Sequence, residues 1–464
     1  MRRLLKYTTL ILTVLMFSGS VWAYNYTEHV TQAPNNKGDV LIFPWFLSAD
    51  GGWQTKLTVI NTDEVNCVVA KLVVRSQVNS TELLDFFLYL SPADVWTGYI
   101  RYDSTRKLVV MYSNDDSAIS ALDVSTAPPT PTWASTTPIN QPWQGTLCTS
   151  PADTQFMGYV EVIGIAAGTT DNGPGVAKSE IYKAYYNLTT PATLATTVTL
   201  RYIDAIDADA VAGVTNAYRR NVLAGYQKFF NGIIGQSAEL RATALKDYRN
   251  RGAATTSAET RLGVTADNNL LEVEGALSKD QVAMPYVNAN DVAIHFFTFP
   301  TKLTQGCGTS ALSPYFTQNA DANLCIPYSL RTYDVSENFP KSGTPFSGGS
   351  STTSLKFCKE LDYNVSSPFI YTEGWAIYKF FKTVPSVDTF TSGTTFGAAV
   401  PLSFDGTPVL PTFAYIGASG LTAAYAAWTD DLVYCSLAKS TTTSLPDYQY
   451  SDAAGCVTAT PLLP

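Results

Sequence analysis

Alternation of apolar and polar residues with a period of two is the feature of this sequence that most restricts its fold. Between residues 39 and 110, the segments TKLTVIN, VVAKLVVR and ELLDFFLYL place apolar side chains at every second position, and Lys71 falls on the polar side of its segment. Side chains alternate between the two faces of a strand, so this pattern indicates half-buried strands. Such strands are typical of antiparallel sheets.

The composition supports the same fold class. Only 15% of the residues are charged and 12% are aromatic, which favours strands joined by turns over surface helices. We predict a mainly β protein built as an antiparallel β-sandwich, Ig-like or jelly-roll-like, with a helical insertion. The stretch FPWFLSADGGWQTKLTVINT at 43–62 is expected to be a hairpin with its turn at 48–52, and Leu57 and Val59 are expected to face the core.

The period changes in the middle of the chain. Apolar residues from Val211 to Ile233 recur at intervals of three or four, which predicts one face of an α-helix, and a second helix is expected from Ser237 to Tyr248. Residues 124–154 are rich in Pro, Thr and Ser without a period, so we expect a long surface loop there. The predicted organisation is a signal peptide (1–23), a β-sandwich segment (24–203), a helical insertion (204–260) and a β-rich segment (261–464) that either completes the same sandwich or forms a second one.

The N-terminus predicts export. Arg2, Arg3 and Lys6 precede an apolar run at 10–17, and small residues up to Ala23 fit a signal-peptidase site. We expect cleavage after Ala23 and a location in the periplasm, on the outer cell surface or outside the cell.

The charge balance restricts the partners. The chain has 30 basic and 39 acidic residues, and without the three basic leader residues the balance is 27 − 39 = −12. Nucleic acids and anionic membranes attract basic proteins, so we expect neither as a partner.

Seven cysteines in an exported chain predict disulfides and one residual thiol. Proximity in sequence favours Cys307 with Cys325 and Cys435 with Cys456, although sequence alone does not determine the pairing. Cys67, near the start of a strand-like run, is the candidate for the remaining thiol. No CxxC motif occurs, so the usual signature of a thioredoxin-type redox site or a zinc ribbon is missing.

The usual signatures of catalysis are also missing. There are only two histidines, His29 and His295, and His295 shares a strand face with Phe297 and Phe299, which indicates a packed sheet residue. The sequence has no GxSxG, HExxH or GxxxxGK motif. We therefore predict no enzymatic activity and no cofactor.

Acidic residues leave two less favoured alternatives. A glycoside hydrolase needs two carboxylates beside a sugar. The candidates are Glu272, Glu274, Glu373, Asp430 and Asp431. Two acidic sets could supply oxygen ligands to calcium, but neither has the spacing of an EF-hand loop. These sets are Asp204, Asp207 and Asp209, and Asn114, Asp115 and Asp116. Helix capping and turn formation explain both, so no metal site is predicted.

Several blocks of the chain resemble a family of exported bacterial proteins. GWQTKLTVINT at 52–62 fits the family's GWxTxLxVxNT strand, and YLSPADVW at 89–96 fits its YLSPxDVW block. GYVEVI, HFFTFPTKL, EGWAIYKF and PVLPTFAYIGA extend the resemblance over most of the exported chain. The resemblance implies a β-sandwich protein of the Gram-negative envelope or the extracellular space. The family is largely uncharacterised, so it implies no activity and no catalytic residues.

These features favour a structural or interaction protein of the cell envelope, such as a surface-layer, filament or adhesin subunit. Its expected partners are copies of itself or other envelope components, and the polar, unanchored arm at 24–38 is the segment expected to be exchanged between copies. The alternative is a carbohydrate-binding module or lectin-like receptor. In that case Trp45, Trp133 and Trp143 are the candidate contacts to a partner or a glycan.

Overall fold

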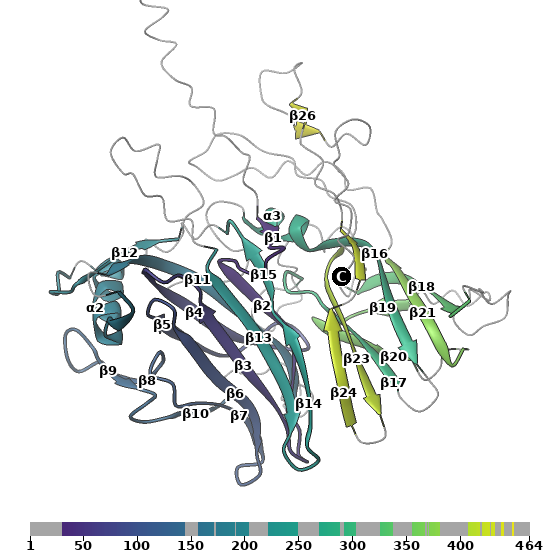
Figure 1. Ribbon diagram of the computed structural model, residues 1–464, viewed down its shortest axis with the longest axis horizontal. Helices are drawn as coiled ribbons and strands as arrows, with labels where there is room; N and C mark the ends of the chain where they lie inside the picture. The colour runs from purple at the N-terminus through teal and green to yellow at the C-terminus, as the bar shows by residue number, and fades with distance from the viewer. Residues whose placement is uncertain are drawn as a thin grey trace, which may run out of the picture.

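The computed structural model describes the chain in segments separated by gaps. The described residues are 30–143, 156–170, 173–190, 192–203, 221–248, 269–287, 292–302, 325–336, 355–366, 369, 371–380, 407–417, 420–426, 428–431, 438–439 and 448–449. They form antiparallel sheets with little helix, which confirms the predicted mainly β class (Figure 1). Within these segments, no helix combines the length and the apolar character needed to span a membrane.

Two large sheets, called sheet I and sheet II, pack face to face as the first sandwich. Sheet I has the order β1 (Thr31–Gln32), β15 (Thr243–Lys246), β2 (Val40–Leu47), β11 (Met157–Thr170), β4 (Asn66–Ser76) and β5 (Glu82–Leu90), and β12 (Val198–Tyr202) also pairs with β11. Sheet II has the order β10 (Ile139–Pro142), β7 (Leu108–Ser113), β6 (Val95–Asp103), β3 (Trp53–Asn61), β13 (Leu223–Asn231) and β14 (Gln236–Arg241). Facing side chains such as Leu57, Leu72 and Trp96 form a single buried core.

A second pair of sheets follows in the chain and has its own core. Sheet III has the order β19 (Leu355–Phe357), β18 (Ile326–Asp334), β21 (Glu373–Phe380), β16 (Ser278–Val287) and β22 (Thr407–Pro408), and β25 (Trp428–Asp431) also pairs with β16. Sheet IV has the order β20 (Leu361–Val365), β17 (Val292–Thr298), β23 (Leu410–Gly417) and β24 (Gly420–Ala426). Aromatic side chains such as Phe297, Phe357 and Tyr378 fill the space between them.

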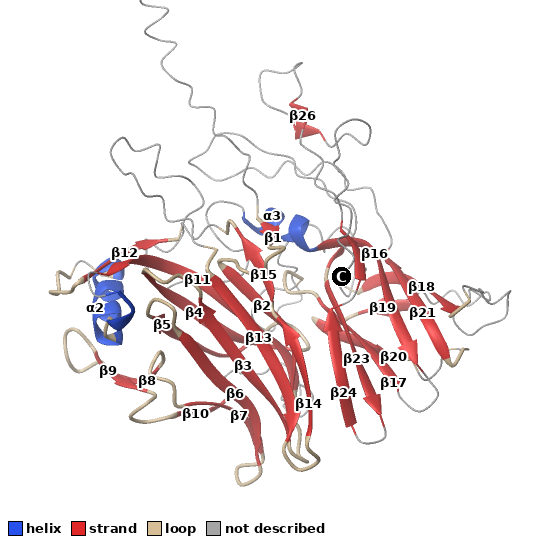
Figure 2. Cartoon of the chain, in the orientation of Figure 1, coloured by secondary structure: helices blue, strands red, loops and turns tan. Residues whose placement is uncertain are grey.

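The remaining elements are short. They are the ribbons β8 (Ile119–Asp123) with β9 (Thr130–Trp133) and β26 (Ala438–Lys439) with β27 (Tyr448–Gln449), a 3-10 turn (Gly173–Gly175), and the helices α2 (Lys178–Thr189) and α3 (Asn269–Leu277). Both helices pack against strands of sheet I (Figure 2). In α2, Ile181, Ala184 and Tyr185 occupy one helical face and are buried.

Because α2 covers the outer face of sheet I, β4 is buried on both faces. The alternate residues Val68 to Val74 face the core, as the sequence predicts, while Val69 on the other face packs against α2. Lys71 is only half-buried, and its ammonium group lies 2.6 Å from the carboxylate of Asp85 on β5.

The predicted helices at 211–233 and 237–248 are wrong wherever the structure describes them. Residues 223–231 form β13, and Ser237 to Lys246 fall on β14 and β15. In β13 the buried positions alternate, so Tyr226 and Phe229 lie on opposite faces although their spacing of three is also helical. Gly225 gives the physical reason: a Cβ there would lie 2.8 Å from Phe43, and glycine destabilises a helix interior. Residues 204–220 lie outside the described segments.

The stretch 43–62 is not a hairpin. Strand β2 belongs to sheet I and β3 to sheet II, so the turn at 48–52 carries the chain from one sheet of the sandwich to the other. Thr55 holds the corner, because its hydroxyl donates to the Leu47 carbonyl at 2.8 Å and accepts from the Leu47 amide at 2.9 Å. Leu57 and Val59 face the core as predicted.

Two further expectations need correction. The predicted surface loop at 124–154 is described up to residue 143. That part contains the strands β9 and β10 and is therefore not an irregular loop. The N-terminal arm is docked over residues 30–38, because Val30 is fully buried and β1 pairs with β15. The predicted signal peptide and residues 24–29 lie outside the described segments.

Candidate functional site

The two sandwiches meet at a small aromatic core. Trp45 of β2 lies between Phe229 of β13 and Phe296 of β17, with ring centroids 3.9 and 4.3 Å apart and interplanar angles of 12° and 17°. The Trp45 side chain is 1% exposed. The other buried members of this core are Ala238, Leu240, Leu361, Ala414 and Ala424. Trp45 therefore contacts the second half of its own chain, and its predicted role as a contact to an external partner or glycan is wrong.

A buried polar cluster lies at the same junction. Arg75 of β4 donates from Nε to Glu161 of β11 at 3.0 Å, and their side chains are 3% and 2% exposed. Burial raises the pKa of the Glu161 carboxyl, and the positive charge of Arg75 opposes that rise. A buried ion pair of this kind is costly to break, because the remaining partner is left as an uncompensated charge.

Ser80 connects this pair to the second sandwich. Its hydroxyl donates to Glu360 Oε2 at 2.8 Å, and Tyr159 Oη lies 2.6 Å from the same Ser80 oxygen. Either of the two hydroxyls can donate in this second bond. The turn between β4 and β5 is held further, because the Gln77 carbonyl accepts from the Glu360 and Leu361 amides, each at 3.0 Å.

Glu360 has the most perturbed carboxyl of the cluster. Burial raises its pKa to about 8, while the nearby ammonium group of Lys302 opposes the shift. Its second oxygen, Oε1, has no hydrogen-bond partner among the described residues, which also disfavours the ionised form. Lys302 is itself fully buried and donates to the carbonyls of Cys358 and Lys359 at 2.7 and 3.2 Å.

We call these two groups together the joint, with an aromatic half centred on Trp45 and a polar half made of Arg75, Ser80, Tyr159, Glu161, Lys302 and Glu360. Perturbed carboxylates often mark active sites. Every side chain of the polar half is at most 3% exposed, however, so none can contact a substrate in this structure. The cluster therefore acts as a connection between the sandwiches.

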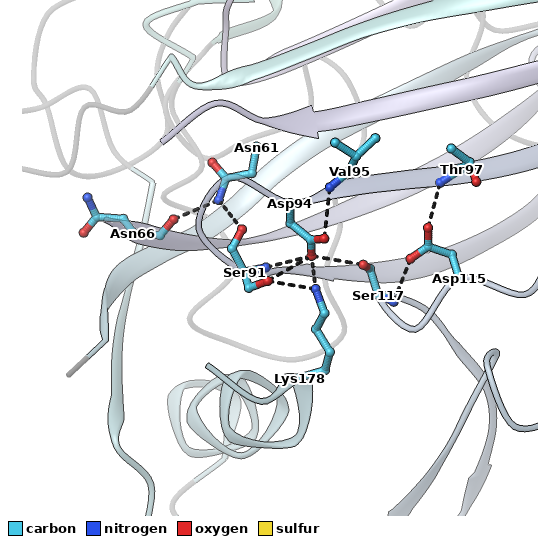
Figure 3. A network of polar contacts seen from close by, with 9 residues as sticks. All are labelled: Asn61, Asn66, Ser91, Asp94, Val95, Thr97, Asp115, Ser117 and Lys178. Carbon is cyan, nitrogen blue, oxygen red and sulfur yellow. Dashed lines mark hydrogen bonds and ion pairs between the residues drawn. The ribbon is translucent and has the colours of Figure 1, made fainter. Parts of the chain in front are cut away.

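A second polar network forms at one end of the first sandwich (Figure 3). The Asp94 carboxylate accepts from the Ser91 amide at 3.0 Å and the Ser117 hydroxyl at 3.1 Å, and it forms an ion pair with Lys178 at the start of α2. Asn61 donates to the Ser91 carbonyl at 2.9 Å. Asn61 is the asparagine of the GWxTxLxVxNT block, and Ser91 and Asp94 belong to the YLSPxDVW block. The two sequence blocks thus meet here.

The network contains a serine and a lysine in contact. Lys178 Nζ lies 3.0 Å from Ser91 Oγ, and burial lowers the pKa of the ammonium group to about 8. A Ser–Lys catalyst needs a neutral lysine to remove the serine proton. At neutral pH Lys178 is protonated and paired with Asp94, and the Ser91 hydroxyl also lies 3.2 Å from Asp94. This arrangement fixes α2 on sheet I.

His295 is a packed sheet residue, as its strand position predicts. Its Nδ1 is 2.8 Å from the Tyr378 hydroxyl and its Nε2 is 3.0 Å from the Pro285 carbonyl. Burial lowers its pKa to about 4, so the imidazole is neutral at physiological pH. His29 lies outside the described segments.

The other two tryptophans predicted to bind a partner are only partly buried. Trp133 of β9 packs edge-on against Tyr89, with centroids 5.8 Å apart. Trp143 packs against Phe46 with centroids 5.9 Å apart. Their role as ligand contacts stays a prediction, and the structure does not bring them together with Trp45.

The cysteine predictions are partly wrong. Cys325 bonds to Cys358 rather than to Cys307. The bond attaches β18 to the short segment that carries Glu360. Cys67 is a buried thiol, as predicted, and its sulfur lies 3.4 Å from the Gly168 carbonyl. Cys307, Cys435 and Cys456 lie outside the described segments.

Two of the acidic candidates for catalysis differ in burial. Glu274 lies on α3 rather than on a strand and is fully buried, whereas Glu373 is exposed at the start of β21. Asp115 accepts from the amides of Thr97 and Ser117 at 3.1 and 3.0 Å, so it stabilises a turn. The described residues contain no group of three potential metal ligands, and Asp204, Asp207 and Asp209 lie outside them.

Sequence reasoning missed Glu360, Lys302 and Lys178. A charged residue in a polar segment carries no signal of burial, and the joint exists only because strands far apart in sequence pack together. The asparagine and aspartate of the two family-like blocks were the one available signal for the second network.

Fold and sites together define a mainly β, disulfide-containing protein made of two joined sandwiches. No protein-family model, no curated protein and no solved structure matches the chain. The resemblance drawn from its sequence blocks therefore stays a prediction.

Proposed function

We propose that the protein is an exported structural and interaction subunit of the bacterial cell envelope, of the surface-layer, filament or adhesin type. The observation that carries this proposal is the joint. A subunit that transmits force needs its parts fixed to one another, and here the stack of Trp45 on Phe296 and the hydrogen bond from Ser80 to Glu360 join the sandwiches. The disulfide between Cys325 and Cys358 supports an oxidising, extracytoplasmic location.

The N-terminal arm supports assembly with other copies. Strand β1 is the edge strand of sheet I and pairs with β15 over only two residues, Thr31 with Lys246 and Gln32 with Leu245. Its anchor is Val30, which is buried beside Tyr248 and Val273. A short edge strand with an apolar anchor is suited to exchange, because the same contacts form whether the arm comes from its own chain or from another copy.

A disulfide that fixes the arm to its own chain tests this proposal. Thr31→Cys with Lys246→Cys places two cysteines at directly paired positions of β1 and β15. We expect the oxidised double variant to remain monomeric by light scattering at concentrations where the wild type and the single variant Thr31→Cys assemble. Equal assembly of all three proteins would rule out arm exchange. A wild type that stays monomeric at every concentration would count against the structural subunit itself.

A further inference from the structure

The outer face of sheet II differs from the other exposed surfaces in its chemistry. Both described helices pack on sheet I, and the second sandwich packs against the inner side chains of β13 and β14, such as Phe229 and Leu240. The opposite face of sheet II carries Tyr99, Tyr112, Tyr226 and Phe230, all half-buried. A solvated sheet face is ordinarily polar, so four aromatic rings on one such face call for an explanation.

Three of these rings lie close together across β7, β6 and β13, with β3 between the last two strands. The Tyr99 ring centroid on β6 lies 6.5 Å from that of Tyr112 on β7 and 6.3 Å from that of Phe230 on β13. Rings from three strands therefore make one platform. Tyrosine combines a flat apolar body with a hydroxyl, which is why it is enriched at binding surfaces.

Cations lie between the rings and are held in place by them. The Arg101 guanidinium lies 4.1 Å from the centroid of Tyr112, and the Lys56 ammonium lies 5.9 Å from that of Tyr99. A cation over a ring face is attracted by the ring and loses part of its rotational freedom before any ligand arrives. Such preorganisation reduces the entropic cost of binding.

The strand register also places Lys56 directly opposite a second lysine, Lys228. Lys56 on β3 and Lys228 on β13 are directly paired positions on the same face. Like charges directly opposite each other destabilise a sheet. Glu239 on β14 pairs with the far side of Lys228 and leaves Lys56 without an acidic neighbour in this row, whose next member is Tyr99. An anion placed over this row would relieve the repulsion.

The charge of this face is opposite to that of the whole chain. The protein has 30 basic and 39 acidic residues. On the outer face of sheet II, Lys56, Arg101, Lys228 and Arg241 stand against Glu239, and Asp103 at the end of β6 is already paired with Arg106 at 2.7 Å. The face is thus a basic and aromatic surface on an acidic protein, which is complementary to an anionic partner.

We propose that this face binds an acidic polysaccharide through the tyrosine rings and the cations Lys56, Arg101 and Lys228. The apolar face of a sugar ring packs on an aromatic ring, and sugar carboxylates accept hydrogen bonds from lysine and arginine. Extended chains suit a flat platform that crosses several strands. The site does not depend on arm exchange, because the arm lies on sheet I. It also replaces Trp45 with Tyr99 and Tyr112 as the glycan contacts.

Binding of alginate oligosaccharides to the full exported chain, measured by calorimetry, tests the proposal. The variants are Lys56→Gln with Lys228→Gln, and Tyr99→Thr. The matched control is Lys359→Gln with Lys379→Gln, which removes two exposed charges from the second sandwich. We expect both face variants to raise the Kd at least tenfold, the control to change it less than twofold, and added salt to weaken binding. Dextran oligosaccharides of the same length should bind at least tenfold more weakly than alginate.

The lysine variant has a second readout that a purely structural role would not produce. Removing the repulsion between Lys56 and Lys228 should leave the unfolding midpoint unchanged or raise it while alginate affinity is lost. The proposal is overturned if alginate does not bind, if dextran binds equally well, or if the control variant loses as much affinity. It is also overturned if a thymidine oligonucleotide binds more tightly than alginate. Loss of self-association in the lysine variant without any alginate binding would assign the face to a second copy of the chain.

Discussion

The aromatic and polar halves of the joint hold the same two sandwiches together by different forces. Around Trp45 the contact is apolar, so its strength comes from buried area and close ring packing and does not depend on protonation. Around Arg75 and Glu360 it depends on directed hydrogen bonds and on charges in a dry environment. The difference indicates that the aromatic half supplies stability in all conditions, whereas the polar half fixes the orientation and makes it sensitive to pH.

Removing one partner of the buried ion pair should have the largest effect. Arg75→Met leaves the Glu161 carboxylate buried without its cation, and we expect a loss of about 3–5 kcal/mol in the free energy of unfolding, measured with urea. Lys71→Met is the control, because its partner Asp85 is 38% exposed and the loss there should be about 1 kcal/mol or less. Equal losses in the two variants would contradict a strongly coupled polar half.

Truncation of the central tryptophan should have a comparable effect. Trp45→Ala removes the ring between Phe229 and Phe296, and we expect the free energy of unfolding, summed over all transitions, to fall by about 3–5 kcal/mol at both pH 5 and pH 8. Trp375→Ala is the control. That side chain is 38% exposed on sheet III, so its truncation should lower the free energy of unfolding by about 1 kcal/mol or less. A loss at Trp45 that changes with pH would remove the distinction between the halves.

The pH dependence of the polar half should follow Glu360. Its pKa is raised from 4.5 to about 8 in the folded protein, so the folded state holds a proton that the unfolded chain releases. The resulting stability is fully present below pH 4.5 and is lost as the pH rises towards 8, with a slope of about 1.4 kcal/mol per pH unit. Glu360→Gln keeps an acceptor for Ser80 and should remove this slope from urea unfolding curves. Parallel curves for variant and wild type would show that Glu360 is not the group responsible.

A single hydrogen bond across the joint should have the smallest effect. Thr298→Val removes the donor to the Pro44 carbonyl and leaves that buried acceptor unpaired, which should cost about 1–3 kcal/mol. Thr199→Val on β12 changes an exposed threonine of a strand and should stay within about 0.5 kcal/mol. If thermal unfolding ranks the two variants the other way round, the Thr298 bond contributes nothing to the joint.

The sequence predicted which side chains of β3 and β4 face the first core, but it did not predict the joint. Alternation correctly placed Leu57, Val59 and Leu72 in the core, because strand periodicity is a local property. It failed at 223–246, where apolar residues three apart, such as Tyr226 and Phe229, fit one face of a helix but lie on opposite faces of a strand, and tertiary packing decides between the two. The roles of Trp45 and Glu360 depend on contacts with residues far away in the chain, such as Phe296 and Ser80, and no local pattern encodes those.

The candidate surface on sheet II shows the same limit. Lys56 and Tyr99 each look like ordinary exposed residues of alternating strands. Only the register places Lys56 opposite Lys228 and brings the rings of Tyr99 and Tyr112 together. Pairing partners are set by the topology β7–β6–β3–β13, which joins segments more than 100 residues apart and was not predicted.

The most direct test is calorimetry of the protein, because our central claim is that the joint makes the two sandwiches one cooperative body. We predict one unfolding transition for the wild type, with equal calorimetric and van't Hoff enthalpies. Trp45→Ala should split it into two transitions, one for each sandwich. Two separate transitions in the wild type, unchanged by Trp45→Ala, would contradict the claim.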